Sequence, residues 1–409
     1  MNISDAERVS AVLENIKYRK TQNINEADLV VVVMCSIRQS AVNRVHGLVE
    51  KFKKIKPTIT VLTGCILKKD RKKFIEGFDY VLDIRNIKKL PEILNKKSES
   101  NSGNYLNITP KCSSKFSANV PIMTGCNNFC SYCVVPYTRE REISRPAKEI
   151  VSEIKNLIKN NYKEIWLLGQ NVNSYKDKNI NFPELLKMIN NIPGNFWIRF
   201  TSSHPKDFNS EVINALATGQ KITPYLNLPI QSGDDKVLKA MNRHYTVNNY
   251  KNKIKKLRKK IPNICLSTDV IVGFPNETKK QFGNTIKLFK EIKFDMAYIN
   301  KYSPRAGTAA AKLKDNISIA EKKRREKVLT EMLKQTALEK NKRFVGKESI
   351  VLIENKNKDY WIGKNEQYKT VKIYQVKSAK DSVQPKIGQF NRVKITEALI
   401  WSLKGELIK

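Results

Sequence analysis

Residues 120–133, Val-Pro-Ile-Met-Thr-Gly-Cys-Asn-Asn-Phe-Cys-Ser-Tyr-Cys, decide how the rest of the chain is interpreted. An apolar stretch typical of a buried strand ends in a loop that carries Cys126, Cys130 and Cys133. This close spacing places three thiols in one tight loop, which suits three corners of a cubane iron–sulfur cluster. Three protein ligands leave one iron of the cubane open, and an open metal position is where a substrate or cofactor can bind.

The alternative for this loop is a structural zinc site with Cys112 as the fourth ligand. Structural zinc usually takes Cys-x2-Cys or mixed Cys/His pairs, and neither the wider gap nor a lone Cys112 fits that pattern well. The chain has 7 cysteines and no visible signal peptide, so a disulfide framework is not expected. We interpret Cys265, on a predicted strand, as an inert buried thiol.

The region around this loop, from about residue 117 to 316, reads as repeated strand–helix units. Such repeats predict a full or partial barrel, with the chemistry in loops after the carboxyl ends of the strands. The predicted strands cover residues 120–123, 164–168, 196–200, 225–228, 264–272 and 296–301.

The two flanking regions have different patterns. Residues 3–95 alternate helices with strands, which predicts a parallel sheet covered on both faces, although this region opens on a helix with no strand before it. Residues 349–408 are rich in short strands and predict a small antiparallel β-barrel, after a long charged helix at 319–343. The predicted α/β architecture therefore has an N-terminal domain (1–95), a polar linker (96–116), a central barrel with closing helix (117–341) and a C-terminal barrel (342–409).

The charge balance is strongly basic. With 76 Lys+Arg against 39 Asp+Glu, the formal net charge is +37, which attracts polyanions such as tRNA or rRNA. Compositional drift in a chain rich in Lys, Asn and Ile is the alternative explanation. No apolar run is long enough to span a membrane, and we expect a cytoplasmic protein.

The spacing C-x3-C-x-aromatic-C resembles the signature of the radical S-adenosylmethionine (SAM) superfamily. Further segments resemble its methylthiotransferases, most closely the MiaB type that modifies tRNA: 126–146, 167–175 (LLGQNVNSY), 199–205 (RFTSSHP), 228–246 and 267–278. This resemblance covers nearly the whole chain. It implies a flavodoxin-like N-terminal domain, a partial (βα)6 radical SAM barrel and a C-terminal TRAM β-barrel that contacts RNA.

The resemblance also implies an activity, namely insertion of a methylthio group at C2 of N6-isopentenyladenosine, 3′ to the anticodon of tRNA. The implied cofactors are two 4Fe-4S clusters and SAM, which supplies both the methyl group and the radical. The implied partners are the tRNA anticodon stem-loop and an electron donor such as flavodoxin or ferredoxin. The sulfur donor stays open, and we expect a monomer.

Three alternatives remain beside this activity. A protein-directed branch of the family (RimO type) methylthiolates an aspartate of a ribosomal protein, and another branch acts on threonylcarbamoyladenosine in tRNA. The third alternative is a catalytically impaired RNA-binding protein that keeps one cluster.

Family roles carry over to this chain motif by motif. Cys126, Cys130 and Cys133 would hold the SAM cluster. Gly169 and Gln170 would lie near the SAM amino group. Ser202, Ser203, Gln231 and Asp269 are candidates for polar contacts to SAM or substrate, and Val272 and Gly273 for the adenine. The structural alternatives are that Gly169 and Gly273 only permit tight turns and that Asp269 is a capping residue.

The family's second cluster is held by three further cysteines, of which this chain shows Cys35, in MCSIRQSA, and Cys65, in Thr-Gly-Cys. The first ligand normally lies in a Gly-Cys-Gln-Met-Asn stretch, and the opening Met-Asn-Ile-Ser-Asp-Ala-Glu resembles its continuation. We therefore expect the first strand and ligand to be absent. A start codon placed too late, a true loss of that cluster, or substitution by Cys112 could each account for this.

Two departures from the family pattern stand out. Val33-Met34 replaces the usual Asn-Thr before Cys35, and Glu140 stands where Gly is usual, so a bend needing φ > 0 would be strained there. In the C-terminal barrel, basic and aromatic residues suit phosphate contacts and base stacking, although alternation would place about half of the aromatics in the core. These residues are Lys347, Lys369, Lys372, Lys377, Lys386, Arg392, Lys394, Tyr360, Trp361, Tyr368, Tyr374 and Phe390.

Overall fold

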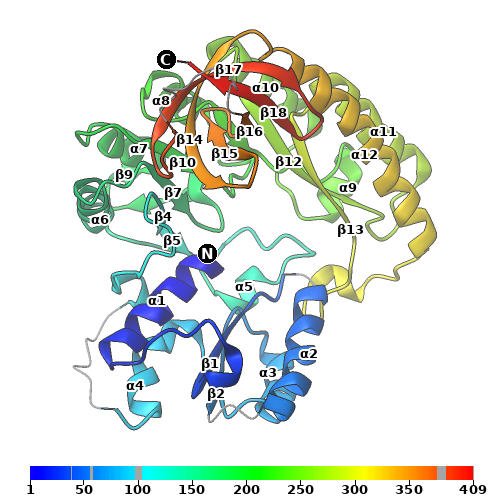
Figure 1. Cartoon of the computed structure of the whole chain (residues 1–409). Coiled ribbons are helices and arrows are strands. Elements are labelled where there is room, and N and C mark those ends of the chain that lie inside the picture. Colours follow the sequence, from blue (N-terminus) through cyan, green and yellow to red (C-terminus); the bar gives the residue numbers. More distant parts are fainter. Residues whose placement is uncertain (38, 56–58, 97–103, 375–383, 409) are drawn as a thin grey trace. The chain divides into compact units, whose positions relative to one another are not determined.

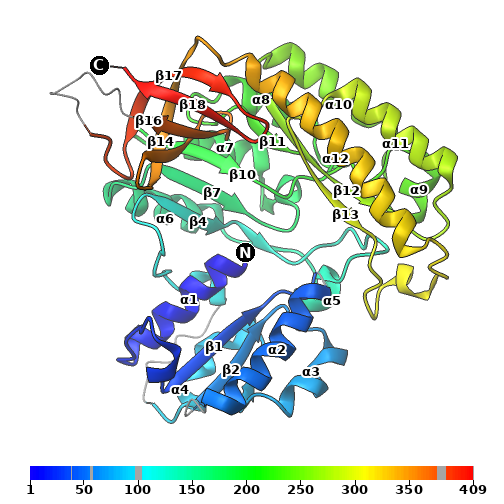
Figure 2. The ribbon, with the colours of Figure 1, turned by 45° about the vertical axis from the view of Figure 1, so that its right-hand side comes forward.

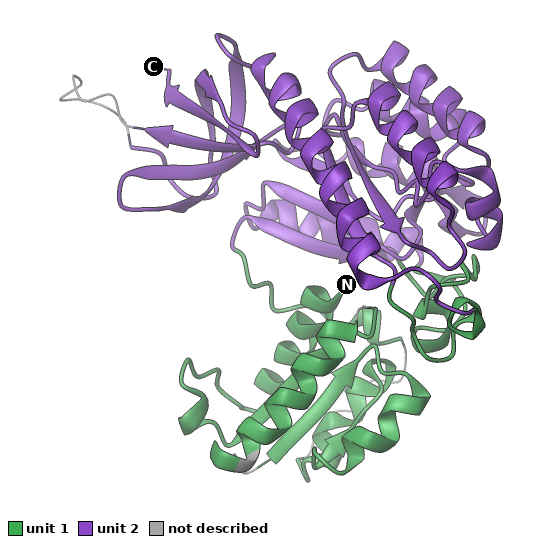
Figure 3. Cartoon of the chain, turned by 90° about the vertical axis from the view of Figure 1, so that its right-hand side faces the viewer, with its two compact units in different colours: residues 1–114, 123–145, 303–313 green, residues 115–122, 146–302, 314–409 purple. Residues whose placement is uncertain are grey.

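The structure is a computed structural model that describes the chain apart from residues 38, 56–58, 97–103, 375–383 and 409. The chain divides into two compact units (Figure 3). The first comprises residues 1–114, 123–145 and 303–313, and the second comprises 115–122, 146–302 and 314–409. No helix among the described residues is long and apolar enough to cross a bilayer.

The first unit is built on a parallel sheet of β1 (Leu29–Met34), β2 (Ile59–Gly64) and β3 (Tyr80–Val81), in that order. Its helices are α1 (Asn2–Asn15), α2 (Gln39–Ile55), α3 (Lys68–Ile75), α4 (Leu90–Ile93) and α5 (Val135–Thr138). Short 3-10 turns lie at Ile24–Glu26, Ile84–Lys89, Tyr105–Asn107 and Ala309–Lys312, and β5 (Met123–Thr124) pairs with β6 (Ile143–Ser144).

Alternation along the strands creates two apolar faces on this sheet. Val31 and Val33 pack with α1, α4 and the turn that contains Tyr105, whereas Val30 and Val32 pack with α2 and α3 (Figure 2). The parallel sheet covered on both faces confirms the predicted architecture.

Two details of this unit differ from expectation. The strand predicted at 80–84 ends at Val81, because the Asp83 carboxylate accepts a hydrogen bond from the Arg85 N–H at 2.9 Å and starts a 3-10 turn. The end of the predicted linker is not solvated, since Tyr105 and Leu106 are buried in the core beside α1. Most of the polar stretch at its start lies outside the described residues.

The second unit contains the predicted strand–helix repeats (Figure 1). Two parallel sheets, β4-β7-β10 and β11-β12-β13, are connected by a parallel bridge between Ile198 and Ile222. The six strands are β4 (Ser117–Pro121), β7 (Glu164–Leu168), β10 (Trp197–Phe200), β11 (Tyr225–Asn227), β12 (Cys265–Val272) and β13 (Met296–Lys301). The intervening elements are α6 (Ala147–Lys159), β8 (Lys176–Asp177), β9 (Ile180–Asn181), α7 (Phe182–Asn190), α8 (Ser210–Thr218), α9 (Asp235–Ala240), α10 (Val247–Lys260) and α11 (Lys279–Ile292).

The long helix α12 (Ile319–Lys342) leads to a closed barrel in the order β14-β15-β16-β18-β17. Its strands are β14 (Glu348–Lys356), β15 (Tyr360–Asn365), β16 (Thr370–Tyr374), β17 (Phe390–Ala398) and β18 (Ser402–Leu407). The prediction of an antiparallel barrel is wrong for one pair, because β16 and β18 run parallel. A closed barrel with an odd number of strands cannot alternate direction throughout, so one parallel pair is unavoidable.

The C-terminal barrel is joined to the strand–helix barrel by a buried contact around Arg199. Its guanidinium pairs with Glu164 at 2.6 Å and donates to the carbonyls of Asn365 and Glu366, each at 2.8 Å. The Tyr368 ring lies 4.9 Å from that of Trp166, edge to face. The turn between β15 and β16 is thereby held against side chains of β7 and β10.

Candidate functional site

The loop of Cys126, Cys130 and Cys133 begins at a close approach of two backbone segments. Gly125 has φ +81°, and a Cβ on it would lie 2.0 Å from the carbonyl oxygen of Arg141. The Cys126 N–H then donates to the carbonyl of Glu140 at 3.1 Å. Only glycine can precede Cys126 here, so the start of the loop is fixed by the backbone.

Hydrogen-bond donors approach the sulfur atoms of Cys126 and Cys133. The Val135 N–H lies 3.5 Å from Cys133 Sγ, and Asn128 Nδ2 lies 3.7 Å from Cys126 Sγ. Burial raises the pKa of the Cys126 thiol, while hydrogen bonds from Asn128 favour its thiolate. Hydrogen bonds to cysteine sulfurs are one means by which proteins tune iron–sulfur clusters.

The three thiols lie in one loop, but their sulfur atoms are not positioned as the ligands of a metal ion. Within the described ranges, no group of three or more His, Cys, Asp or Glu side chains is arranged to hold a metal ion. The donor chemistry nevertheless fits a 4Fe-4S cluster, since three thiols share one loop and N–H groups point at two of them. Cys112 and the zinc alternative gain no support from this arrangement.

Cys35 and Cys65 follow the carboxyl ends of two adjacent parallel strands. Met34 and Gly64 are register partners at the ends of β1 and β2, and the next residue of each strand is a cysteine. The Cys65 N–H donates to the Met34 carbonyl at 2.9 Å. Because Gly64 has φ +102° and a Cβ there would lie 2.5 Å from that carbonyl oxygen, this approach requires glycine.

Arg139 contacts the sulfur of Cys65 and was not predicted from the sequence. Its Nε donates to Cys65 Sγ at 2.9 Å, its Nη1 donates to the Tyr105 hydroxyl at 3.2 Å, and its Nη2 pairs with the buried Asp5 carboxylate. Burial raises the pKa of the Cys65 thiol, and the Arg139 charge opposes that shift. Burial and the Asp5 carboxylate raise the pKa of Tyr105 to about 12.

Glu140 has the positive φ that its place in the bend led us to expect, at 62°. Its carboxylate forms an ion pair with Arg85. The neighbouring Phe129 also has positive φ, at 47°, and its ring is covered by the Arg141 guanidinium at 4.4 Å. The cysteine loop and the segment that follows it each contain one strained position, Phe129 and Glu140, and each of these residues makes a side-chain contact with an arginine.

Most of the remaining predicted residues lie at or after the carboxyl ends of strands in the second unit. Gln231 and Asp269 are brought together, because the Gln231 N–H donates to the Asp269 carbonyl at 2.8 Å. Asp269 lies inside β12 and accepts from Asn227 Nδ2 at 3.1 Å, so it is not a capping residue. Gly169 and Gln170 follow β7, Ser202 and Ser203 follow β10, and Val272 ends β12 before Gly273.

Backbone conformation and packing explain why position 273 is a glycine, without any contact to a ligand. Its φ is +69°, and a Cβ there would lie 2.4 Å from Cγ of Lys322. Its N–H donates to the Glu277 carboxylate at 2.7 Å, and Glu277 in turn pairs with buried Arg325 at 2.7 Å. A glycine is therefore required at this position whether or not an adenine contacts it.

The loops after β7 and β10 hold buried polar atoms that lack a partner among the described residues. This is the observation that fits a polar ligand here, because buried polar groups are nearly always hydrogen-bonded. The atoms are Gln170 Oε1, Asn171 Oδ1, Asn173 Nδ2, Ser203 Oγ and His204 Nε2. Gln170 and Ser203 were predicted, whereas the other three were not.

Two further features were not found from the sequence. Asn227 and Tyr225 on β11 both bond to Ser267 on β12, at 3.1 Å and 2.9 Å. His204 is neutral, because burial and the nearby Arg243 lower its pKa to about 2. For the hydrogen bonds to Ser267, the only local signal in the sequence is the placement of polar residues at alternate strand positions. The lowered pKa of His204 depends on tertiary packing, which the sequence does not show.

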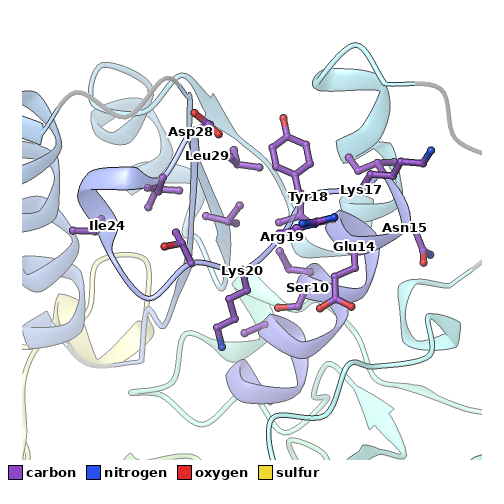
Figure 4. A pocket seen from close by; sticks show the side chains of 18 of the residues that line it. Ser10, Glu14, Asn15, Lys17, Tyr18, Arg19, Lys20, Ile24, Asp28 and Leu29 are labelled. Carbon is purple, nitrogen blue, oxygen red and sulfur yellow. The ribbon is translucent and has the colours of Figure 1, made fainter.

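A cavity of about 1070 Å³ in the first unit contains none of the predicted site residues. It is lined by α1, the segment after it and β1, including Leu13, Tyr18 and Leu29 (Figure 4). Among the described residues β1 pairs only with β2, so the cavity lies along its other edge. The predicted ligand thiols lie elsewhere in the first unit, on the cysteine loops, and the unpartnered polar atoms described above lie after strands of the second unit.

Comparison with known proteins identifies the relatives of this chain. Family models match as "Radical SAM superfamily" over residues 120–289, "Uncharacterized protein family UPF0004" over 1–84 and "TRAM domain" over 342–408. The chain is 40% identical to the tRNA-2-methylthio-N(6)-dimethylallyladenosine synthase of Clostridium novyi (strain NT), over 100% of this chain and 94% of that protein. The synthase of the same name from Dictyoglomus thermophilum is 39% identical, over 100% and 96%.

Solved structures resemble this chain in fold. The cobalamin-dependent radical SAM enzyme OxsB with aqua-cobalamin bound superposes with a TM-score of 0.55 at 10% identity, over 81% of this chain and 52% of that chain. The radical SAM methyltransferase TsrM from Kitasatospora setae, with cobalamin and a [4Fe-4S] cluster bound, gives a TM-score of 0.53 at 14% identity, over 74% and 68%.

Proposed function

The chain belongs to the MiaB-type radical SAM methylthiotransferases, and we propose that it methylthiolates C2 of N6-isopentenyladenosine, 3′ to the anticodon of tRNA, in the cytoplasm. The observation that carries this proposal is the 40% identity to a tRNA-2-methylthio-N(6)-dimethylallyladenosine synthase across the whole chain. The TRAM match over residues 342–408 supports RNA as the substrate class.

Cys126, Cys130 and Cys133 would hold the 4Fe-4S cluster of this enzyme. When bound, the cluster supplies an electron that cleaves SAM, with a flavodoxin or ferredoxin as the proposed donor. The protein's own contribution is to fix the three thiols on one loop and to direct the N–H of Val135 at Cys133 and the Asn128 amide at Cys126. Those donors stabilise the thiolate forms that ligate iron.

The strand ends of the second unit would bind SAM and the target base. Gln170 and Ser203 each present a buried oxygen without a partner among the described side chains, which suits hydrogen bonds to a polar ligand. Asn227 fixes the orientation of the Asp269 carboxylate through its 3.1 Å hydrogen bond. Ser202, Gln231, Val272, Gly273 and Gly169 remain candidates for backbone or side-chain contacts to SAM.

Cys35 and Cys65 would contribute to the site that handles sulfur. They follow adjacent strand ends, and Arg139 from the segment after the SAM-cluster loop donates to Cys65 Sγ. The family's use of a second cluster in this domain supports this assignment. The sulfur donor is left open.

Product analysis tests the proposal. The full chain would be expressed in a bacterium lacking its own enzyme of this type, and tRNA nucleosides and ribosomal-protein peptides would be compared by mass spectrometry. We expect the methylthio group on isopentenyladenosine, abolished by Cys126→Ala and retained by Cys265→Ala, which alters a buried thiol outside the site.

The other outcomes separate the alternatives. A methylthio group on a ribosomal-protein aspartate would indicate the protein-directed branch, and one on threonylcarbamoyladenosine would indicate the other tRNA branch. SAM cleavage by the purified chain without any sulfur insertion would favour the impaired RNA-binding protein with one cluster.

A further inference from the structure

The structure sorts the five aromatic residues of the C-terminal barrel into different environments. Trp361 is 5% exposed and belongs to the barrel core. Tyr368 contacts Trp166, and Phe390 packs on Trp197 with ring centroids 4.6 Å apart. These three aromatics are occupied by protein contacts, which leaves Tyr360 and Tyr374 as candidates for contact with RNA bases.

Tyr360 and Tyr374 are direct cross-strand neighbours on the outside of the barrel. They are register partners on β15 and β16, and their ring centroids lie 5.3 Å apart at an interplanar angle of 38°. Their neighbours Trp361 and Ile373 point into the core, so strand alternation directs both tyrosines outward. Both side chains are half-buried, and they form a pair of adjacent aromatic surfaces.

Lys372 lies beside this aromatic pair. Lys372, two residues before Tyr374 on the same strand face, lies with its Nζ 5.4 Å from the Tyr360 ring centroid. Lys404 of β18 is the register partner of Lys372, although its ammonium pairs with Glu397 at 2.8 Å. Glu406, the register partner of Tyr374, is the carboxylate nearest in register to the pair. Cations beside aromatic rings suit a phosphate backbone with its bases stacked on the rings.

We propose that Tyr360, Tyr374 and Lys372 on the outer face of β15 and β16 form a stacking subsite for an unpaired base of the RNA substrate, away from the base that is modified. The proposal rests on the proposed function, because it takes RNA as the substrate. Its support is the outward pairing of two tyrosines beside Lys372, which has no ion-pair partner among the described residues, in a chain of net charge +37. Stacking tolerates any base, so the subsite would add affinity without sequence preference.

The test compares paired variants of the full chain. The probe is an anticodon stem-loop RNA that contains isopentenyladenosine, and its dissociation constant is measured by fluorescence anisotropy across a salt series. Tyr360→Val with Tyr374→Val keeps strand-forming side chains but removes both π-faces, and we expect binding to weaken about tenfold or more. Tyr360→Phe with Tyr374→Phe keeps the rings and should bind within about twofold of the wild type.

Charge and stacking give different signatures. Lys372→Ala should reduce the slope of log K against log salt by about one. The valine pair should leave that slope unchanged. SAM cleavage without RNA and the melting temperature show whether each variant is folded, and Tyr80→Val, which alters a tyrosine that is 39% exposed in the first unit, is the matched control.

Two results must be distinguished. If folded valine variants bind the RNA as tightly as the wild type, the subsite does not exist and the tyrosine pair only stabilises the sheet. If the wild type neither binds this RNA nor modifies tRNA, the proposed function itself fails.

Discussion

At the scale of single residues, Arg139 makes the most consequential unpredicted contact. Its side chain is 3% exposed, and that of its partner Asp5 is fully buried. The same guanidinium donates to Cys65 Sγ and to the Tyr105 hydroxyl. A buried cation shared by three acceptors fixes the position of the Cys65 sulfur, and removing it leaves a buried carboxylate without its counter-charge.

We therefore expect Arg139→Met to destabilise the first unit by about 3–5 kcal/mol, the usual effect of leaving one buried charge unpaired. Native-state amide exchange of peptides from β1 and β2, followed by mass spectrometry, measures this loss in the full chain. Adding Asp5→Leu should restore part of the stability. Arg85→Met is the control, because the solvent-accessible ion pairs of Arg85 with Asp83 and Glu140 should contribute about 1 kcal/mol or less each.

His204 predicts a pH dependence. Its Nδ1 accepts from the Lys206 N–H at 3.2 Å, and burial with Arg243, Lys206 and Lys253 nearby lowers its pKa to about 2. The unfolded chain binds this proton near pH 6.5, so the stability contribution is full above that pH and is lost as the pH falls below it.

Between about pH 7.5 and about pH 5, the wild type should lose about 2 kcal/mol more than His204→Asn, whose side-chain oxygen can still accept from Lys206. Urea unfolding at the two pH values measures the difference. His244→Asn, at an exposed histidine, should keep the wild-type pH dependence. An equal loss in the wild type and His204→Asn would show that His204 is charged in the folded chain.

The residues that the sequence could identify are those whose relationship is local. Cys126, Cys130 and Cys133 lie within one loop, so their spacing alone indicated their chemistry. Arg139 and Cys65 are 74 positions apart, and the tertiary fold of the first unit brings them together. No spacing rule can indicate such a pair in a single sequence.

At the scale of elements, Arg199 joins the two barrels of the second unit. Its guanidinium lies 4.8 Å from the Trp197 ring centroid and 5.0 Å from that of Tyr368. It satisfies the Glu164 carboxylate and two carbonyls of the turn between β15 and β16. A single arginine thus supplies the donors that the turn needs when it leaves water.

Arg199→Met should destabilise the second unit by about 3–5 kcal/mol, since Glu164 and two carbonyls lose a buried donor. Tryptophan fluorescence during urea unfolding reports on this contact, because Trp166 and Trp197 flank it. Lys334→Ala is the control, and removal of its exposed pair with Glu331 should cost about 0.5 kcal/mol or less. If Arg199→Met unfolds at the same urea concentration as the wild type, the turn between β15 and β16 does not depend on the Arg199 side chain.

Element prediction succeeded for several strands of the parallel sheets. The strands at 29–33, 164–168 and 296–301 were placed within one residue of their observed bounds. The strand at 80–84 was overextended, because the Asp83 cap competes with strand pairing. The parallel pairing of β16 with β18 depends on how the barrel closes, which hydrophobic alternation does not encode.

At the scale of the whole molecule, charge and similarity answer different questions. The net charge of +37 favours a polyanionic partner but does not locate the contact. Similarity over the whole chain identifies the family, and the tested parts of the predicted architecture, the parallel sheets and the closed barrel, are confirmed. The predicted domain boundaries stay a prediction, since the loop of Cys126 groups with the first unit and the strands that follow it with the second.

Because the two cysteine sites lie on separate loops, iron binding should be lost from each independently. After anaerobic reconstitution of the full chain, Cys126→Ala should remove about four irons, one cubane cluster, and leave any iron held by Cys35 and Cys65 unchanged. Cys65→Ala should remove any iron held by Cys35 and Cys65 and leave the iron of the Cys126 loop unchanged. Cys265→Ala should change the iron content of neither site. Iron and sulfide per chain, with electron paramagnetic resonance of the reduced protein, measure both sites. Loss of all iron in Cys65→Ala would contradict this independence, and would instead mean that Arg139 transmits the state of Cys65 to the loop that holds the SAM cluster.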